Sequence, residues 1–330
     1  MRRAAAAHGA RDGGVVLLNA LIIISVVAAI ATSLVRSGLE GRNRYALMQR
    51  SDQAHIYARA AEALAAELLA QDSEANETDH LGEAWAEDRG TLTIEGATLT
   101  ATLTDLQGRL NVNQILRRSV PSEEGAPVTV SMSEPEYDLL RQLIEDAGGP
   151  DTLALRVAEW LAPSIDGLPG PVGDVPYQRG DAPYLRPAAP VLSVRDLRLV
   201  EGMEAPVMAA LETSVAALPG ETALNINTAP RPVLQALMPG LSPVQMSRFL
   251  AHRAETPFAA RSDFESYAAK IVSPATMDAL AALDIDVKTN WFLLETQVDH
   301  ELGRARLFSI ILRPDGGGRA TVHLRSGAPL

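Results

Sequence analysis

The sequence has no cysteine, no proline in its first 120 positions and a deficit of positive charge. Without cysteine, disulfides, thiol catalysis and thiolate metal sites are excluded. All 21 prolines lie at or after Pro121. Because proline breaks helix interiors, this asymmetry allows a very long helix near the N-terminus. The net charge of −12 disfavours extended binding to phosphate backbones.

The composition is that of a globular protein, and one segment stands out because it is long and uncharged. The 330 residues are 47% hydrophobic and 21% charged, which allows two domains and a sizeable core. From Val15 to Val35 there is no charged residue, a run long enough to span a membrane as a helix. Arg2, Arg3 and Arg11 form a basic leader before it, and Arg36 ends it.

Three interpretations fit this apolar segment. A secretory signal peptide would be cleaved after the small residues Ala29-Ile30-Ala31, although no turn-forming residue precedes them. A plain transmembrane anchor would keep the basic leader in the cytoplasm. A prepilin-type leader would be cut after Gly14, leaving Val15 as the new N-terminus and retaining the apolar helix.

The residues after Arg36 favour the third interpretation, because the helical pattern continues without a break. Apolar residues recur mostly at helical spacing, with charged residues between them. The apolar positions are Leu39, Tyr45, Met48, Ile56, Ala60, Leu64 and Leu68. A helix from about Val15 to Ala70 would be about 80 Å long, apolar all round in its first half and amphipathic in its second.

Strand patterns lie on both sides of a helical region. The stretch "TLTIEGATLTATLTD" (91–105) predicts a hairpin that turns at Glu95-Gly96. Strands are next expected only in "TNWFLLETQV", "RARLFSIILR" and "RATVHLRS". Helices between them are expected to begin at Ser133 and Ser193 with capping boxes, at Asp151, and near Thr228, Ser242, Ser262 and Ser273, with Pro243 and Pro274 in first turns. The order sheet, helices, sheet indicates that one domain interrupts another.

Four blocks, in order, resemble a known family: "TDHLGEAWA" (78–86), "DLQGRLNVNQIL" (105–116), "LNINTAPRPVLQAL" (224–237) and "NWFLLETQVD" (290–299). With the N-terminal segment, they are similar to the minor pseudopilin K family of the type II secretion system. The resemblance runs from Gly14 to about Arg325. It implies an α+β, pilin-like fold of a long N-terminal transmembrane and amphipathic helix and an antiparallel sheet, with a large inserted α-helical domain.

The resemblance implies a domain plan and a function. The expected parts are a leader (1–14), a stem helix (15–71, with 15–35 in the membrane), a sheet domain (72–111 and 289–330) and the inserted domain (112–288). The protein would be non-enzymatic, anchored in the bacterial inner membrane with its globular part in the periplasm. It would lie at the pseudopilus tip, start assembly with the I- and J-type minor pseudopilins and aid export of folded proteins. Prepilin peptidase, the inner-membrane secretion platform and the exported proteins would be further partners.

Asn19 would be the fifth residue of the mature chain. Most pilins and pseudopilins have a glutamate there, which is thought to neutralise the N-terminal amine of an adjoining subunit. An unpaired acid inside a membrane costs about 2.5–3.5 kcal/mol on insertion scales. A subunit with no neighbour above it gains nothing from that acid, so Asn19 fits a tip position. The alternative is one tolerated polar residue in a long apolar helix.

The proline- and glycine-rich segment 159–190 is where the resembled family carries acidic residues that can hold calcium. Here Ala162 and Ser164 stand at positions expected to be acidic. The remaining candidate ligands are Asp166, Asp174 and Asp181. Three carboxylates could contribute to a site of six to eight oxygens, and a solvated loop stiffened by proline is the favoured alternative.

Segment 224–264 resembles a helix-hairpin-helix unit, so the alternative function is a membrane-anchored periplasmic DNA-handling protein. DNA-binding versions use a Gly-x-Gly hairpin, whereas here Gly240 is followed by Ser242 at the partner position. Between Ala223 and Lys288, six basic residues are balanced by six acidic ones, so nucleic-acid binding is not expected. No zinc-protease, nucleophile-elbow or P-loop motif occurs, and no catalytic residue is expected. Asp79-His80, next to Trp85, is instead expected to order the end of the stem helix against the sheet.

Overall fold

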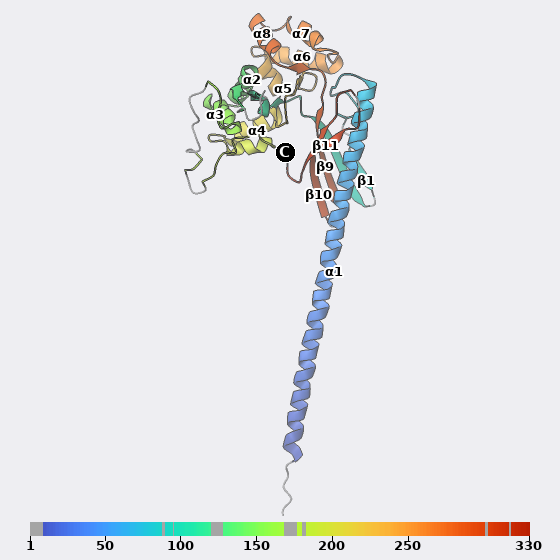
Figure 1. Cartoon of the computed structure of the whole chain (residues 1–330). Coiled ribbons are helices and arrows are strands. Elements are labelled where there is room, and N and C mark those ends of the chain that lie inside the picture. Colours follow the sequence, from blue (N-terminus) through green and yellow to red (C-terminus); the bar gives the residue numbers. More distant parts are fainter. Residues whose placement is uncertain are drawn as a thin grey trace, which may run out of the picture.

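The computed structural model describes residues 9–87, 90–94, 96–119, 128–167, 177–179, 183–300, 303–316 and 318–330. Within the first helix, side chains are described at 17–18, at 20–42 and from 53 onward. This helix, α1 (Gly9–Ala75), continues for 67 residues, about 100 Å at 1.5 Å per residue. It projects from the head as a stem (Figure 1). The long helix predicted from the absence of proline is confirmed.

A five-stranded antiparallel sheet packs against the C-terminal part of α1. Its order is β1 (Thr91–Ile94), β2 (Ala97–Asp105), β9 (Trp291–His300), β10 (Gly303–Leu312) and β11 (Thr321–Ser326). Ile94 is paired with Ala97, and Gly96 between them has a φ of 82°, so the predicted hairpin turn is confirmed. Because β2 pairs with β9, the first and last parts of the sequence form one sheet.

Small side chains let α1 lie close to the sheet. The buried apolar positions on this face are Ala54, Ala58, Ala61, Ala65, Ala66 and Leu69. Glu62 is buried on the same face, where its carboxylate accepts hydrogen bonds from Ser309 Oγ at 2.6 Å and Arg325 Nε at 2.8 Å. The helix is therefore fixed to the sheet by packing and by a paired charge.

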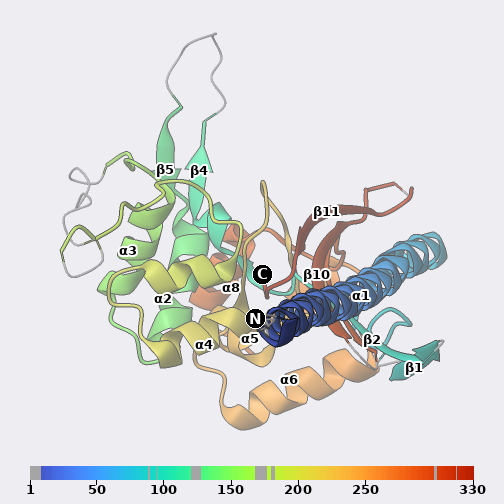
Figure 2. The same cartoon turned by 90° about the horizontal axis from the view of Figure 1, so that it is seen from below.

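Helices occupy the chain between the two parts of the sheet. They are α2 (Glu134–Asp146), α3 (Thr152–Leu161), α4 (Ala205–Ser214), α5 (Arg231–Leu237), α6 (Pro243–Glu255), α7 (Arg261–Ala268) and α8 (Pro274–Ala282), with 3-10 helices η1 (Val112–Ile115) and η2 (Val194–Leu199). They extend away from the stem, to one side of the sheet and beyond its end (Figures 1 and 2). Their shared core contains Trp160, Phe249 and Phe264, all fully buried.

The helices begin where the sequence predicts at some positions and elsewhere at others. Capping boxes form at Ser193 and Ser242, and Pro243 and Pro274 occupy first positions. The box predicted at Ser133 is absent, because its hydroxyl donates to Glu136 and accepts from Arg117 Nε at 3.0 Å. Asp151 does not cap α3, since its own backbone is already helical. The helix predicted near Thr228 begins at Arg231, after an extended Pro230.

Three short strand pairs were not predicted. They are β3 (Leu110–Asn111) parallel to β6 (Val215–Ala216), β4 (Leu116–Arg118) antiparallel to β5 (Val130–Met132), and β7 (Leu224–Asn225) parallel to β8 (Ile285–Asp286). The β4–β5 pair stands out from the head in Figure 2. Strands of two or three residues show too little alternation to be recognised, so the expectation that strands return only near residue 289 was wrong.

Candidate functional site: the membrane helix and a buried polar junction

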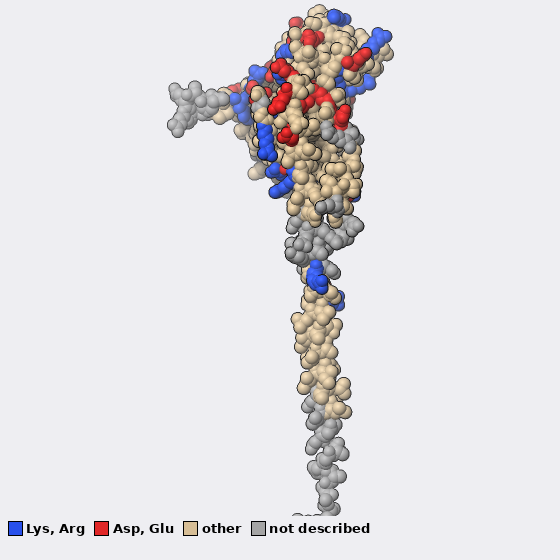
Figure 3. Space-filling view, turned by 90° about the vertical axis from the view of Figure 1, so that its right-hand side faces the viewer, with Lys and Arg blue, Asp and Glu red and all other residues tan. Residues whose placement is uncertain are grey.

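The helix α1 carries an apolar stretch that no other described part of the chain covers. The span Ala20–Arg42 contains an 18-residue window whose mean hydropathy is 2.1, and none of that window is buried. At 1.5 Å per residue, the 23 residues of the span extend over about 34 Å, enough to cross a hydrocarbon core. Figure 3 shows an uncharged length of stem below the head. Its length and composition fit a single membrane-spanning anchor.

Where α1 ends, a buried ion-pair network ties it to the sheet. Arg313, after β10, donates to Asp79 (Nη2 to Oδ1, 2.6 Å) and to Asp72 (Nη1 to Oδ2, 3.0 Å). Its guanidinium lies over the ring of Phe292, 5.1 Å from the centroid. Thr289 completes the network, because its N–H donates to Asp79 Oδ2 at 2.7 Å and its carbonyl accepts from Arg313. A buried network of this kind fixes the orientation of α1 relative to the sheet, because moving one member leaves the charge of another without a partner.

Asp105, at the end of β2, forms the second part of this junction. Its carboxylate is buried and accepts five hydrogen bonds. Oδ1 accepts from the N–H groups of Gln107 and Gly108, at 2.6 and 3.2 Å. Oδ2 accepts from Asn225 Nδ2 at 3.0 Å, from Thr289 Oγ1 at 2.6 Å and from Thr228 Oγ1. One carboxylate therefore joins both sequence segments of the sheet to the helical region.

The motif Leu-Asn-aliphatic-Asn occurs at 110–113 and again at 224–227, and both copies are used in the same way. In each copy, Oδ1 of the first asparagine accepts a hydrogen bond from the N–H of the second. The distance is 3.2 Å between Asn111 and Asn113 and 2.9 Å between Asn225 and Asn227. The second asparagine binds both backbone groups of a distant residue, Val191 in the first copy and Phe258 in the second. The two motifs thereby hold loops of the helical region, and the second also binds the junction, because Asn225 donates to the carboxylate of Asp105.

Burial raises the pKa of two junction carboxyl groups to about 6. For Asp72, burial is the main cause, the negative charges of Glu83 and Asp79 add to it, and Arg313 opposes it. For Asp105, burial is again the main cause, and the hydrogen bonds that its carboxylate accepts oppose it. In both groups the folded protein binds a proton more tightly than the unfolded chain does.

The carboxylates of Asp72, Asp79 and Glu83 are the group of described residues close enough to hold a cation, with ligand atoms within 4.8 Å of one another. Two of them already pair with Arg313. Glu83 Oε2 accepts from the indole N–H of Trp85 at 2.5 Å. The chain itself supplies a donor to each of the three carboxylates and leaves Glu83 Oε1 without a hydrogen-bond partner among the described residues. We assign the group to the junction.

Asp72→Asn is expected to change how stability depends on pH. A carboxyl group whose pKa is raised by folding contributes stability that is complete below about pH 4 and is lost as pH rises through about 6. When the pH is raised from 4.5 to 7.5, the free energy of unfolding of the wild type should fall by about 1–2 kcal/mol more than that of the variant. This figure is reduced for the partial exposure of Asp72. Chemical denaturation of the full-length protein in detergent micelles at both pH values measures this. The exposed Asp278→Asn serves as the control, and parallel curves for Asp72→Asn and wild type would contradict the assignment.

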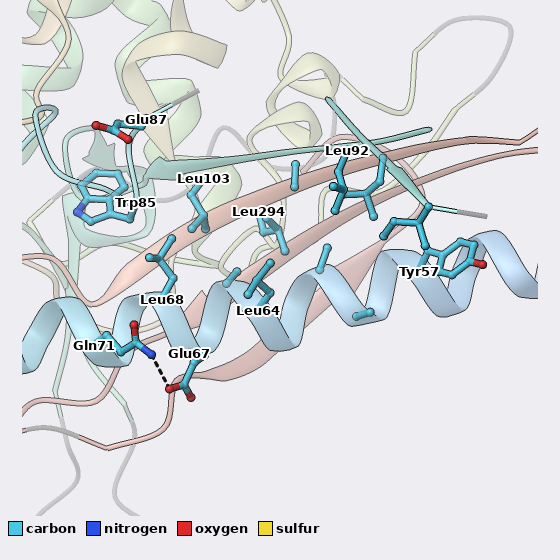
Figure 4. A pocket seen from close by; sticks show the side chains of 16 residues that line it. Tyr57, Leu64, Glu67, Leu68, Gln71, Trp85, Glu87, Leu92, Leu103 and Leu294 are labelled. Carbon is cyan, nitrogen blue, oxygen red and sulfur yellow. Dashed lines mark hydrogen bonds between the residues drawn. The ribbon is translucent and has the colours of Figure 1, made fainter. Parts of the chain in front are cut away.

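An apolar groove lies between α1 and the sheet, beside the junction. Its volume is about 300 Å³, and aliphatic side chains from both elements line it, among them Leu64, Leu68, Leu92, Leu103 and Leu294 (Figure 4). At its rim Gln71 Nε2 donates to Glu67 Oε1 at 2.9 Å. The groove offers packing surface and no arrangement of groups for catalysis among these residues.

Comparisons with known proteins decide the family. Family models described as type II secretion system (T2SS), protein K, match residues 108–220 and 224–286. The type II secretion system protein K of Aeromonas hydrophila is 31% identical over 316 residues, which cover 92% of this chain and 93% of that protein. The chain belongs to the type II secretion system protein K family.

Other protein K sequences and a solved structure are also similar to this chain. The protein of Klebsiella pneumoniae is 29% identical over 272 residues, 80% of each chain, and that of Pseudomonas aeruginosa is 27% identical over 323 residues, 93% of this chain and 90% of the other. The fold is similar to a chain of the GspK-GspI-GspJ complex from the enterotoxigenic Escherichia coli type 2 secretion system. The TM-score is 0.70 at 22% identity, over 86% of this chain and 98% of that one. As a protein K, the chain is a minor pseudopilin, a structural component of type II secretion.

The candidate processing, assembly and calcium residues of this protein K lie far from the junction in sequence, and the structure describes few of their side chains. Gly14, Val15 and Asn19 lie on α1, and their side chains are outside those described. Asp166 is exposed just after α3, with its N–H bonded to the carbonyl of Val130 at 2.7 Å. Asp174 and Asp181 lie outside the described residues.

The expectation that Asp79 orders the end of the stem helix against the sheet is confirmed by its bonds to Arg313 and Thr289. Sequence reasoning missed the rest of the junction, although each of the four blocks that carry the resemblance supplies a member. Asp79, Asp105, Asn225 and Asn290 come from the four blocks in turn, and the N–H of Asn290 donates to Gln107 Oε1 at 2.7 Å. The available signal was the repeated Leu-Asn-aliphatic-Asn pattern, which places amides where apolar strand residues are expected.

Proposed function

We propose that this protein K lies at the tip of the type II secretion pseudopilus, where it initiates assembly with the I- and J-type minor pseudopilins and aids export of folded proteins across the outer membrane. The observation that carries the proposal is a wide helical head beside one stem (Figures 1 and 2), with the end of the stem joined to the sheet by the ion pairs of Arg313. Such a head would obstruct stacking if the subunit repeated along a filament, whereas an end subunit meets no such obstacle. The similar fold found in the GspK-GspI-GspJ complex supports the choice of partners.

The proposed organisation keeps the predicted boundaries: leader 1–14, stem 15–71, sheet domain 72–111 and 289–330, and inserted domain 112–288. Within the insert, α5, the turn at Gly240 and α6 form a helix-hairpin-helix-like unit with a packing role. Arg253 of α6 supports that role, because it is buried and donates to the carbonyl oxygens of Ile226 and Ala229 at 2.9 and 2.7 Å. A guanidinium used in this way is not available to a phosphate.

Processing and location follow from the same proposal. Prepilin peptidase cuts after Gly14, Val15 becomes the first mature residue, and the helix stays in the inner membrane with the head in the periplasm. The basic leader supports this orientation. The secretion platform and the exported proteins are the further partners, and neither catalysis nor nucleic-acid binding belongs to the proposal.

The function is tested by purification of the tagged full-length chain from membranes that also contain the I- and J-type pseudopilins and the main filament subunit. A tip subunit should retain the I and J types in comparable amounts, with little of the main subunit. A large excess of the main subunit over the I and J types would contradict a tip position.

Asn19→Glu is expected to leave processing intact and to reduce recovery of the I and J types several-fold in the same purification. The added carboxylate would have no amine to pair with at the tip, and an unpaired acid in the membrane costs about 2.5–3.5 kcal/mol. Asn19→Gln keeps a neutral amide and is the matched control. Wild-type assembly and secretion in the Asn19→Glu strain would count against the tip.

A further inference from the structure

The carboxyl end of α3 is buried, so its carbonyl groups require donors from elsewhere in the chain. Trp160, Leu161 and Ala162 are 2%, 0% and 1% exposed. The last four carbonyls of a helix have no partner within the helix, and unpaired buried carbonyls are unfavourable. The negative end of the helix dipole also lies here, which favours a cation.

Two arginines from other segments supply the donors. Arg186 Nη1 donates to the carbonyls of Ala162, at 2.8 Å, and Glu159, while its Nη2 donates to that of Pro163 at 3.4 Å. Arg118, on β4, donates to the carbonyl of Leu161 at 2.8 Å. A guanidinium suits this task because it carries a permanent charge and five N–H groups in a fixed plane.

Aromatic packing holds Arg186 at this position. Tyr184 and Tyr177 pack against the buried ring of Trp160, with centroid distances of 6.4 and 5.3 Å. The N–H of Tyr184 donates to the carbonyl of Tyr177 at 3.0 Å, and its hydroxyl donates to that of Leu199 at 2.7 Å. The segment that carries Arg186 is thereby fixed against the end of α3.

The family resemblance implies calcium in this same segment, and the described residues do not fit that ion. Calcium needs six to eight oxygen ligands, usually including several carboxylates. After Trp160, the described part of the segment offers one carboxylate, that of Asp166, and it is exposed. The carbonyls at the end of α3 already accept from Arg186 and Arg118, whose positive charges repel a second cation.

We propose that Arg186 is a built-in substitute for a divalent cation at the carboxyl end of α3. It supplies from within the chain the positive charge and the donors that join segment 183–186 to the helix. The head of this protein K therefore keeps its fold without bound calcium.

The test is thermal unfolding of the full-length protein in detergent micelles, with calcium chloride or with EGTA. The wild-type Tm should agree within about 1 °C in the two conditions. Arg186→Ala should lower the Tm by roughly 4–8 °C, because several hydrogen bonds from a charged donor are lost. Arg186→Lys should recover about half of that loss, since it keeps the charge without the planar fork. Arg179→Ala, at an exposed position of the same loop, should change little.

Two results would overturn the proposal. One is a wild-type Tm that falls by several degrees in EGTA and returns with calcium chloride. The other is an Arg186→Ala protein as stable as Arg179→Ala. If Arg186→Ala does not fold, the wild-type response to EGTA and the Arg186→Lys Tm decide the question.

Discussion

Arg313→Met is expected to lower the free energy of unfolding by about 3–5 kcal/mol, because it leaves the buried carboxylate of Asp79 and the partly buried carboxylate of Asp72 without their counter-charge. Asp72 and Asp79 both pair with this guanidinium, whose side chain is 9% exposed. Methionine retains much of the aliphatic volume, so the loss reports on charge rather than on packing. Chemical denaturation of the full-length protein in detergent micelles measures it.

Two further variants make this prediction specific. Arg319→Met changes an exposed arginine in the same connection between β10 and β11. Its free energy of unfolding should stay within about 0.5 kcal/mol of the wild-type value. Adding Asp79→Asn to Arg313→Met removes one stranded charge and should restore part of the loss, as a double-mutant cycle would detect. A loss for Arg313→Met no greater than that for Arg319→Met would mean that the network does not hold the stem to the sheet.

Gly108→Ala is expected to destabilise the head by about 2–4 kcal/mol through overpacking of the junction. A Cβ at this position would lie 2.7 Å from Oγ1, 2.9 Å from the carbonyl carbon and 3.0 Å from the carbonyl oxygen of Thr228. Two of these atoms belong to the backbone, so Thr228 would have to shift and its hydrogen bond to Asp105 would weaken. Secretion in a strain that depends on this variant should fall with the stability of the head.

The matched control is Gly327→Ala, where the added Cβ meets no atom within 4 Å. Limited proteolysis of the two full-length variants should cut the Gly108→Ala head faster than the Gly327→Ala head. Equal resistance to protease, together with equal denaturation midpoints, would show that the contact between 108 and 228 is not critical.

The elements that could be predicted from sequence are those whose signals are local. The stem helix follows from the missing proline and the continuous apolar pattern, and the β1–β2 turn follows from Gly96 between alternating residues. Pro243 and Pro274 correctly mark helix starts, because proline fits a first helical turn.

What could not be predicted depends on distant partners. Asp105 binds Asn225, Thr228 and Thr289, all more than a hundred positions away, and nothing beside Asp105 in the sequence indicates them. The capping box at Ser133 failed for the same reason, since Arg117 from another segment binds the hydroxyl. Pairing of two-residue strands such as β3 and β6 is likewise decided by the tertiary fold.

The mass of the mature protein decides whether this protein K is processed after Gly14 and keeps its apolar helix, as we propose. The full-length chain would be purified from membranes of cells with and without prepilin peptidase, and its intact mass and N-terminal peptide measured. We expect a chain that begins at Val15 when the peptidase is present and retains residues 1–14 when it is absent. A mature chain that begins at Thr32, or a leader retained despite active peptidase, would contradict the proposal.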